Sequence, residues 1–348
     1  MARILGWDIG GANIKAARLP RHTDASGRKH VVSVPFEIWR EKDRLPELLR
    51  DLSTQLFSTA SPEALAVTMT AELSDVFLTK REGVTFVLES IRTCFPAQAV
   101  FVLSLSGEFI PIGEALLHPL DFAATNWLAS ALWIARKIPS CLLVDVGSTT
   151  TDILPILKGQ TIVAGRTDTA RLTTGELIFT GALRTNLAAI VQTVPVAGRD
   201  CRVASEYFAV SGDVHLILGN LRPQDYTCAT PDGQPPSLDS ARRRLARLVC
   251  ADMEMLSVDE IDSMARYIHA RQVLQIREGL SQVLSRVPEL QQYPIVVAGS
   301  GAFLGLAAAK SMNLSLGDLE GVFQDNEQSV VPCVSAACLL AEQLKDRS

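Results

Sequence analysis

The sequence contains one short pattern twice, and this repeat limits the folds available to the chain. In each copy an apolar run ends in Asp-x-Gly, at Asp8-Ile9-Gly10 and again at Asp145-Val146-Gly147. A turn of small residues follows, and a second apolar run begins after it. Each copy therefore predicts a strand, over 4–9 or 142–146, then a tight turn and a second strand. A third strand is expected over 31–38 in the first copy and over 161–164 in the second. Such a repeated unit predicts a duplicated fold in which the two glycine turns lie at the floor of one cleft.

The two turns carry no bulky side chains, so their backbone N–H groups can approach phosphate oxygens closely. Their residues are Gly10, Gly11, Asn13 and Lys15 in the first copy, and Gly147, Ser148, Thr149 and Thr150 in the second. Asp8, Asp145 and Asp152 flank the turns and could hold Mg²⁺ directly or through water. An ordinary hairpin with a polar turn is the alternative for either copy alone. The repetition favours the phosphate-binding interpretation.

The composition excludes several classes of protein. A chain of 348 residues is long enough for two lobes, and 47% hydrophobic with 20% charged residues indicates a globular protein. The net charge of −5 and the dispersed Lys and Arg residues argue against a nucleic-acid partner. No apolar run approaches the ~18 residues of a membrane span. Seven scattered cysteines without a CxxC pair argue against zinc and predict a cytoplasmic protein.

Helical patterns over 45–57, 83–94 and 121–138 alternate with strand-like patterns over 65–69 and 99–105 between the two copies. This alternation is typical of a largely parallel sheet covered by helices. A strand expected over 65–69 is followed by a segment that contains Thr70, Glu72 and Asp75. Ligands gather at the carboxyl ends of strands in such sheets, so Glu72 and Asp75 are candidate cleft carboxylates. The alternative is that Thr70 caps the next turn and both acids face solvent.

Two later segments add candidates. The polar run 173–181, with Gly175 and Glu176, would either touch a substrate above the second turn or form a plain connecting loop. Near residue 298 an expected strand runs into Gly299, Ser300 and Gly301 and then a helix. A helix N-terminus opened by small residues binds anions and nucleotides, although such turns also serve packing alone.

Three glycine turns in this order resemble the actin, sugar-kinase and Hsp70-like ATPase superfamily. Its two phosphate loops correspond here to 8–15 and 145–152, and its nucleoside-side turn corresponds to 298–301. The resemblance implies an α/β, ribonuclease H-like duplicated fold with two lobes around a central cleft. It implies a first lobe over 1–138, completed by a C-terminal helix over 326–348. The second lobe would span 139–325, with a helical and loop insertion at about 200–290.

Within this superfamily the chain is similar to the hydantoinase A and oxoprolinase branch. More narrowly, it resembles the tetrahydromethanopterin-linked one-carbon pathway proteins of methylotrophs and methanogens. The runs that carry this likeness are 6–15, 68–75, 126–127, 175–181 and 211–219. Archaeal members join a tyramine–glutamate phenol to an aminomethylfuran carried as a diphosphate ester. The resemblance therefore implies a transferase of methanofuran biosynthesis that forms an ether and releases pyrophosphate.

That chemistry suggests roles for the candidates. The turns and Lys15 would stabilise the departing diphosphate, with Mg²⁺ on Asp8, Asp145 or Asp152 sharing the task. A phenol, with a pKa near ~10, needs a general base at neutral pH, and Glu72, Asp75 and Asp8 are the candidates. The partners would be small molecules, a furfuryl diphosphate and a phenolic amine. A homodimer stays open.

The same turns would also serve ATP, so two alternatives stay open. One is an ATP-dependent enzyme, either a small-molecule kinase or a hydantoinase/oxoprolinase-type enzyme, which the turn at Gly299 to Gly301 favours. The other is a non-catalytic nucleotide-binding regulator. Pyrophosphate released without ATP would support the transferase, and ADP formed with a metabolite would support the ATP-dependent enzyme.

Overall fold

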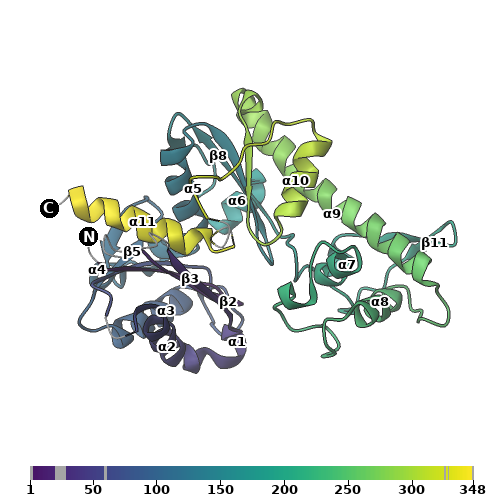
Figure 1. The fold of residues 1–348 in the computed structure, drawn as a ribbon, viewed down its shortest axis with the longest axis horizontal. Coiled ribbons are helices and arrows are strands. Elements are labelled where there is room, and N and C mark those ends of the chain that lie inside the picture. Colours follow the sequence, from purple (N-terminus) through teal and green to yellow (C-terminus); the bar gives the residue numbers. More distant parts are fainter. Residues whose placement is uncertain (1–2, 20–28, 59–60, 325–326, 328, 347–348) are drawn as a thin grey trace.

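Two β-sheets organise the computed structural model (Figure 1). The structure describes residues 3–19, 29–58, 61–324, 327 and 329–346. The strands of the first sheet are β1 (Ile4–Ile9), β2 (Asn13–Arg18), β3 (His30–Pro35), β4 (Ala64–Met69), β5 (Ala99–Leu103) and β6 (Phe109–Pro111). Those of the second are β7 (Cys141–Val146), β8 (Thr151–Leu157), β9 (Gln160–Thr161), β10 (Leu177–Ile178) and β13 (Ile295–Ala298). A separate hairpin pairs β11 (Thr193–Val196) with β12 (Arg199–Arg202).

The first sheet has the order β3-β2-β1-β4-β5-β6, and the second follows β10-β8-β7-β13 with β9 beside β8. The helices of the first half are α1 (Ile38–Glu41), α2 (Leu45–Phe57), α3 (Lys80–Cys94), α4 (Ile112–Ala115) and α5 (Asn126–Lys137). Later come α6 (Asp168–Thr174), α7 (Ser211–Ile217), α8 (Leu238–Arg247), α9 (Val258–Arg286), α10 (Ala302–Ser311) and α11 (Val331–Asp346). Short 3₁₀ turns are η1 (Lys42–Arg44), η2 (Pro119–Phe122), η3 (Leu187–Ala189), η4 (Pro223–Asp225) and η5 (Pro288–Gln292). The predicted α/β class is confirmed.

The predicted strand–turn–strand repeat is present, once in each sheet. β1 pairs antiparallel with β2, and β7 pairs in the same way with β8. The same hydrogen bond closes both turns, from the Gly10 N–H to the Asn13 carbonyl at 3.0 Å and from the Gly147 N–H to the Thr150 carbonyl at 2.8 Å. A parallel strand then extends each unit, β4 beside β1 and β13 beside β7. The fold is therefore duplicated around the two turns.

The two faces of β1 meet different layers, because successive side chains of a strand point to opposite sides. Leu5, Trp7 and Ile9 pack into a core with α2 and α3. On the other side a Cβ at Gly6 would lie only 2.0 Å from the Cys333 carbonyl of α11. Asp8 shares this second face with Gly6, so it points toward the region between the two sheets.

Helices α5 and α11 fill the space between the sheets. One hydrophobic core joins residues of both helices to Ala66 of the first sheet and to Leu143 and Val296 of the second. Helix α11 packs on β1, β4 and α5, so the end of the described chain returns to the first sheet (Figure 1). The predicted lobe boundaries stay a prediction, and residues 1–2, 20–28, 59–60, 325–326, 328 and 347–348 of those ranges lie outside the described residues.

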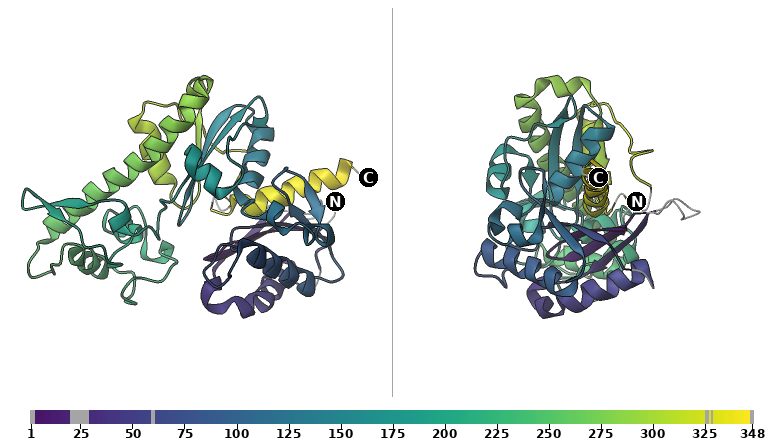
Figure 2. Two further views of the ribbon diagram at one scale, coloured as in Figure 1. Left: turned by 180° about the vertical axis from the view of Figure 1, so that it is seen from behind. Right: turned by 90° about the vertical axis from the view of Figure 1, so that its left-hand side faces the viewer.

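A helical region between β10 and the middle of α9 has hydrophobic cores of its own, one joining α7, α8 and the first half of α9. The second half of α9 packs against the second sheet through Ile276, Leu280 and Val283. A single helix of 29 residues therefore links the helical region to the sheet (Figure 2). It begins at a capping box in which Ser257 and Glu260 exchange hydrogen bonds, which satisfies its first backbone donors.

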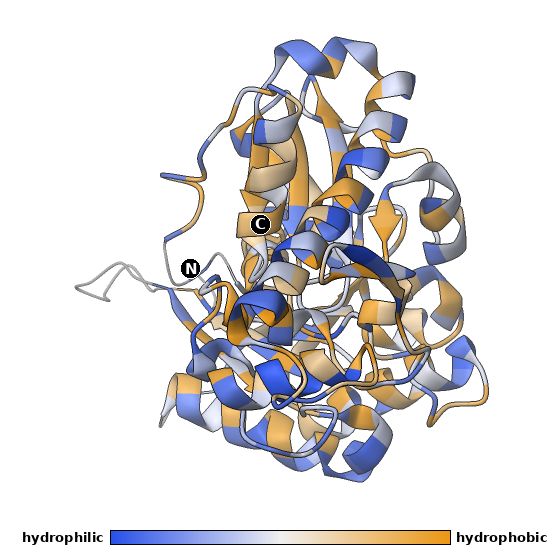
Figure 3. Cartoon of the chain, turned by 90° about the vertical axis from the view of Figure 1, so that its right-hand side faces the viewer, coloured by the Kyte–Doolittle hydropathy of each residue, from blue (hydrophilic) through white to orange (hydrophobic). Residues whose placement is uncertain are grey.

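Polar and apolar residues alternate along the outer helices, while the strands are largely apolar (Figure 3). This alternation is what helices with one buried face require. Within the described residues, no helix is long and apolar enough to cross a membrane.

Candidate functional site

A cavity of about 770 Å³ lies between the two hairpin turns. The first hairpin contributes Asp8, Gly10, Gly11, Ala12, Asn13 and Lys15, and the second contributes Asp145, Gly147, Ser148, Thr149, Thr150 and Asp152. The structure thus brings the predicted turn residues of both copies to a single cavity. Its other walls come from residues 70–74, Lys80, the start of α5, and α6 with the segment before it.

The turns offer unused hydrogen-bond donors to this cavity. The backbone N–H groups of Gly11, Ala12, Ser148 and Thr149 donate no hydrogen bond to any described residue. Backbone donors that lack an internal partner need water or a ligand, and clustered donors of this kind form anion sites. The two turns are therefore suited to phosphate oxygens.

Two of the turn glycines have no structural reason to be glycine. Neither Gly11 nor Gly147 has a positive φ. A Cβ at Gly147 would approach only the Thr150 carbonyl, at 3.5 Å, and a Cβ at Gly11 would approach only the Ala71 Cα, at 4.0 Å. Gly10 differs, because a Cβ there would lie 2.7 Å from the Asn13 carbonyl. The missing side chains at Gly11 and Gly147 therefore keep the turns open toward the cavity.

The carboxylates beside the turns resist ionisation. Burial raises the pKa of Asp8 although the Lys15 ammonium, 3.7 Å away, lowers it. Burial, and then the Asp152 carboxylate, raises the pKa of Asp145 to about 7, while Lys15 opposes the rise. The Asp8 Oδ1 atom is buried without a hydrogen-bond partner among the described residues. A cation bound here would stabilise both carboxylates.

Arg171 is a site residue that the sequence patterns did not single out. It is 1% exposed, donates a 2.6 Å hydrogen bond to Asp152, and places its guanidinium 4.2 Å from the ring centroid of Trp127. Burial still raises the pKa of Asp152 despite this partner. Arg171 and Asp152 are 19 residues apart, and no local sequence motif predicts their ion pair.

Glu72 lies at the edge of the cavity, as predicted. Its side chain is 1% exposed, and Lys80 lies 3.6 Å from its Oε1 atom and 2.6 Å from Asp168. Burial raises the pKa of Glu72, and its Oε2 atom has no hydrogen-bond partner within the described chain. The alternative of a solvent-facing acid is therefore wrong for Glu72. Thr79, and not Thr70, caps the helix that follows.

Asp75 has a different position. It is exposed and lines an adjoining cavity, not the one between the turns. The turn of residues 72–75 directs it away, because the Ser74 N–H donates to the Ala71 carbonyl and the chain reverses there. The expectation that Asp75 acts as a base beside the turns is corrected.

Comparison with known proteins now adds to this geometry. A sequence model of the hydantoinase/oxoprolinase family matches residues 63–345. The chain belongs to this family. The match begins after the first turn, so it leaves out residues 8–15 and includes Glu72 and the second turn.

Two relatives carry the same name, (4-{4-[2-(gamma-L-glutamylamino)ethyl]phenoxymethyl}furan-2-yl)methanamine synthase. The one from Methanocaldococcus jannaschii is 34% identical over 343 residues, which cover 98% of each chain. The one from Methanococcus vannielii is 40% identical over 126 residues, or 36% of this chain and 56% of that protein. The predicted likeness to the methanofuran branch of the hydantoinase/oxoprolinase family is confirmed.

One solved structure supports the fold. A nucleotide-free acetone carboxylase superposes with a TM-score of 0.58 at 9% identity, covering 97% of this chain and 70% of that one. An activator of 2-hydroxyisocaproyl-CoA dehydratase from Clostridium difficile gives 0.44 at 11% identity, covering 99% and 98%. The chain has the actin/Hsp70-like ATPase fold.

Five predicted ligand residues do not line the cavity, namely Gly175, Glu176, Gly299, Ser300 and Gly301. Gly175 ends α6 in the left-handed conformation, with φ +73°, which is a capping role. Glu176 is fully buried, and its carboxylate accepts from the N–H groups of Ala164 and Gly165 and from Arg286. Their sequence is that of a binding loop, but their contacts are internal.

The turn after β13 has a packing reason for its glycines. Gly299 has φ +90°, and a Cβ there would lie 2.3 Å from the Val146 carbonyl. A Cβ at Gly301 would meet the Val146 side chain at 2.6 Å, while Ser300 is exposed. These residues let α10 start close against β7, which was the alternative interpretation of this turn.

The three aspartates do not form a metal site by themselves. Among the described residues, no three His, Cys, Asp or Glu side chains are grouped so that they could hold an ion. Asp152 pairs with Arg171, which leaves Asp8 and Asp145 as carboxylates that could reach a cation. Mg²⁺ typically takes one or two carboxylates and completes its shell with water and substrate phosphates.

Proposed function

We propose that this chain is a transferase of methanofuran biosynthesis. It condenses an (aminomethyl)furanylmethyl diphosphate with the phenol of tyramine or γ-glutamyltyramine, forms an ether and releases pyrophosphate. The observation that carries the proposal is the 34% identity across 98% of both chains with a synthase whose name describes such a phenoxymethylfuran. The cavity between two turns with unused N–H groups supports it.

The bond changes define what the site has to do. The phenol oxygen attacks the furylmethyl carbon, the bond from that carbon to the diphosphate oxygen breaks, and the phenol proton leaves. Negative charge therefore moves onto the diphosphate. Lys15 and the free N–H groups of the turns are suited to stabilise it, since donors fixed in place lose no energy to reorganisation. This is alkyl transfer: only the carbon–oxygen bond breaks, and both phosphorus atoms keep all their bonds to oxygen.

Mg²⁺ fits the residues present. The unpartnered Asp8 Oδ1 atom and the carboxylate of Asp145, whose pKa is raised, are the groups that would hold it, together with the diphosphate. When bound, the ion would neutralise charge on the leaving group.

Glu72 is the residue we propose as the general base. Its buried carboxylate has a raised pKa, which brings its basicity closer to that of a phenol, and its Oε2 atom has no competing donor in the described chain. The backbone of Glu72 packs closely against α3. A Cβ at Gly83 would lie only 2.3 Å from the Glu72 carbonyl, so neither segment has room to shift. Asp8 is the weaker candidate, because we assign its carboxylate to the Mg²⁺ ion.

Aromatic and aliphatic side chains supply the rest of the cavity. Trp39, Trp127, Leu172, Leu177 and Phe179 line it beside the polar turns. A furan and a phenol both need apolar walls of this kind.

The decisive experiment incubates purified protein with the furfuryl diphosphate, γ-glutamyltyramine and Mg²⁺, without ATP. We expect equal amounts of pyrophosphate and of an ether identified by its mass. Conversion of ATP to ADP with no ether from these substrates would overturn the proposal. The ATP-dependent alternative relies on the turn at Gly299 to Gly301, which does not line this cavity.

A further inference from the structure

A second cavity, of about 690 Å³, adjoins the one between the turns. The two share Trp39, Leu73, Ser74, Phe179 and Arg184 as wall residues. The second is completed by Glu37, Arg40, Asp75, Tyr207 and the segment 228–231. A molecule that reacts in the first cavity can therefore extend into this side cavity.

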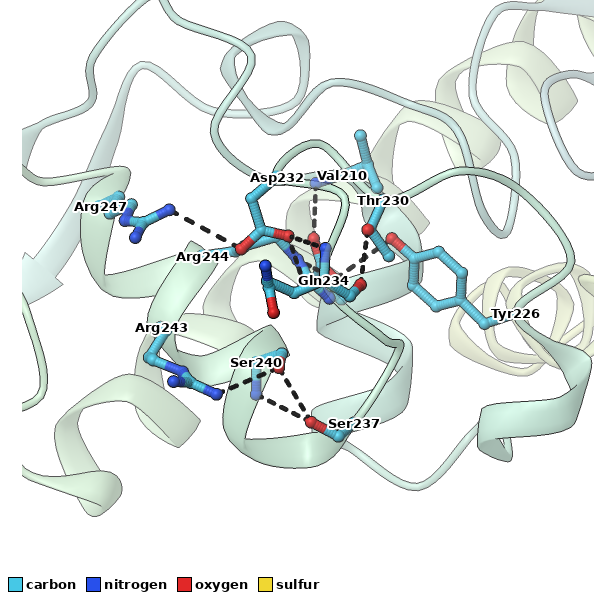
Figure 4. Close-up of polar contacts among 11 residues, drawn as sticks. Val210, Tyr226, Thr230, Asp232, Gln234, Ser237, Ser240, Arg243, Arg244 and Arg247 are labelled. Carbon is cyan, nitrogen blue, oxygen red and sulfur yellow. Dashed lines mark hydrogen bonds and ion pairs between the residues drawn. The ribbon is translucent and has the colours of Figure 1, made fainter.

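The far wall of the side cavity is held in place by a buried ion-pair network (Figure 4). Arg244 is fully buried and donates to Asp213 at 2.6 and 2.9 Å and to Asp232 at 3.0 Å. Tyr226 donates its hydroxyl hydrogen to Asp213 at 3.2 Å. These contacts anchor both ends of the segment 226–232, which includes the wall residues 228–231. The side cavity is thus built from a fixed loop and not from a loose one.

Apolar side chains along the side cavity are left uncovered. Leu73, Phe179 and Tyr207 are 62%, 61% and 54% exposed. Exposed side chains of this size, grouped around a hollow, mark a place that a ligand covers.

The walls of the side cavity carry four charged side chains, Glu37, Arg40, Asp75 and Arg184. Glu37 and Arg40 pair with each other at 2.7 Å, which leaves Arg184 and Asp75 without an ion-pair partner among the described residues. Arg184 stacks over Trp39, with its guanidinium carbon 4.6 Å from the ring centroid, but no described carboxylate lies within ion-pair distance of it. Asp75 likewise has no ion pair within the described residues. One free guanidinium and one free carboxylate suit a ligand that carries both charges itself.

We infer that the side cavity binds an α-amino-acid group at the distal end of the phenolic acceptor, with Arg184 receiving its carboxylate and Asp75 its ammonium. This inference rests on the proposed function, because it takes the acceptor from there. The γ-glutamyl end of γ-glutamyltyramine has this chemistry, and tyramine lacks the carboxylate. The enzyme would then select the glutamylated acceptor through the side cavity.

The test compares the two acceptors in steady-state kinetics at saturating furfuryl diphosphate. For the wild type, kcat/KM should favour γ-glutamyltyramine over tyramine. Arg184→Ala and Asp75→Asn should each reduce that preference at least tenfold, mainly through KM for the glutamylated acceptor. Arg222→Ala and Asp51→Asn, which change exposed charges elsewhere, should leave the preference unchanged.

Two results would overturn the inference. One is an unchanged preference in both variants. The other is an equal loss for both acceptors in Arg184→Ala together with a raised KM for furfuryl diphosphate, which would assign Arg184 to the diphosphate.

Calorimetry with γ-glutamyltyramine alone separates this inference from the proposed function. If the wild type forms no ether yet binds γ-glutamyltyramine, and Arg184→Ala binds it at least tenfold more weakly, the side cavity stands and the proposed reaction falls. If ether forms from both acceptors without preference, the reaction stands and the inference falls. Absence of binding to the wild type would also remove the inference.

Discussion

Lys15 and Asp152 occupy equivalent positions in the two halves of the fold. Lys15 lies opposite Asp8 in the first hairpin, and Asp152 lies opposite Asp145 in the second. The duplicated backbone therefore carries opposite charges at matching points. Arg171 neutralises the Asp152 carboxylate, so Lys15 is the cationic side chain that the two hairpins present to the cavity. We expect it to meet the leaving diphosphate.

Replacing Lys15 by Ala should therefore weaken diphosphate binding. We expect the KM for furfuryl diphosphate to rise at least tenfold, because a charge-assisted hydrogen bond to the anion is lost. Calorimetry with inorganic pyrophosphate measures the same loss without turnover. Lys310→Ala, at an exposed position on α10, is the matched control. An unchanged affinity in Lys15→Ala would show that Lys15 forms an ion pair with Asp8 and does not bind the diphosphate.

Gly147→Ala should separate folding from binding. The added methyl group meets only the Thr150 carbonyl at 3.5 Å, so the free energy of unfolding should change by less than about 0.5 kcal/mol. Affinity for pyrophosphate should nevertheless fall several-fold, since the methyl group occupies space beside the free N–H groups. Gly10→Ala gives the contrast, because its Cβ would clash with the Asn13 carbonyl and destabilise the turn itself. Normal affinity in a folded Gly147→Ala would mean that the second turn is purely structural.

Glu72→Gln should abolish most of the turnover and change its pH dependence. Removal of a general base costs about 10²- to 10⁴-fold in kcat. In the wild type, kcat should increase with pH as Glu72 loses its proton, at a pH above the ordinary carboxyl range because burial raises its pKa. The variant should lack this rise. Glu254→Gln, at an exposed site, should retain it. A Glu72→Gln enzyme with the wild-type profile would require another base.

Asp145→Asn should stabilise the ligand-free protein at alkaline pH. Because the folded pKa of about 7 exceeds the ordinary value of 3.8, the native state holds the proton more tightly than the unfolded state. The contribution of Asp145 to stability is thus complete below pH 4 and declines up to about pH 7. At pH 8 the variant should gain on the order of 2 kcal/mol, less than the full shift allows because cavity water screens the charge. Urea denaturation of the wild type and the variant at pH 4.5 and pH 8 checks this prediction. The same difference in unfolding free energy at both pH values would contradict it.

The local parts of the fold could be predicted from sequence. Strand β1 has the predicted bounds, and α2 spans the predicted 45–57, because apolar spacing and flanking turns define these elements within a few residues. The helix expected over 121–138 starts only at Asn126, since the chain forms η2 first and Ala124 adopts φ +50°. The third strand of the second copy, expected over 161–164, is shortened to Gln160–Thr161.

The site was predictable where its residues are neighbours in the chain. Each turn and its aspartates lie within one continuous run of sequence, so their chemistry could be proposed from that run alone. Lys80 reaches Asp168 across 88 residues, and that contact exists only in the folded chain. Gly299 shows the opposite difficulty. A glycine that packing requires cannot be distinguished in the sequence from a glycine that a ligand requires.

Helix α11 is translated after every other described element, yet it covers the face of β1 that carries Asp8. Gly6 admits the α11 backbone with no space for even a methyl group. While the chain emerges from the ribosome, this face of the first sheet is therefore bare, and a half-made chain exposes the apolar layer that α11 later buries. Completion of the layer behind Asp8 therefore waits until α11 has been made, and a chain cut before residue 331 would keep both turns but lose the helix that packs against β1.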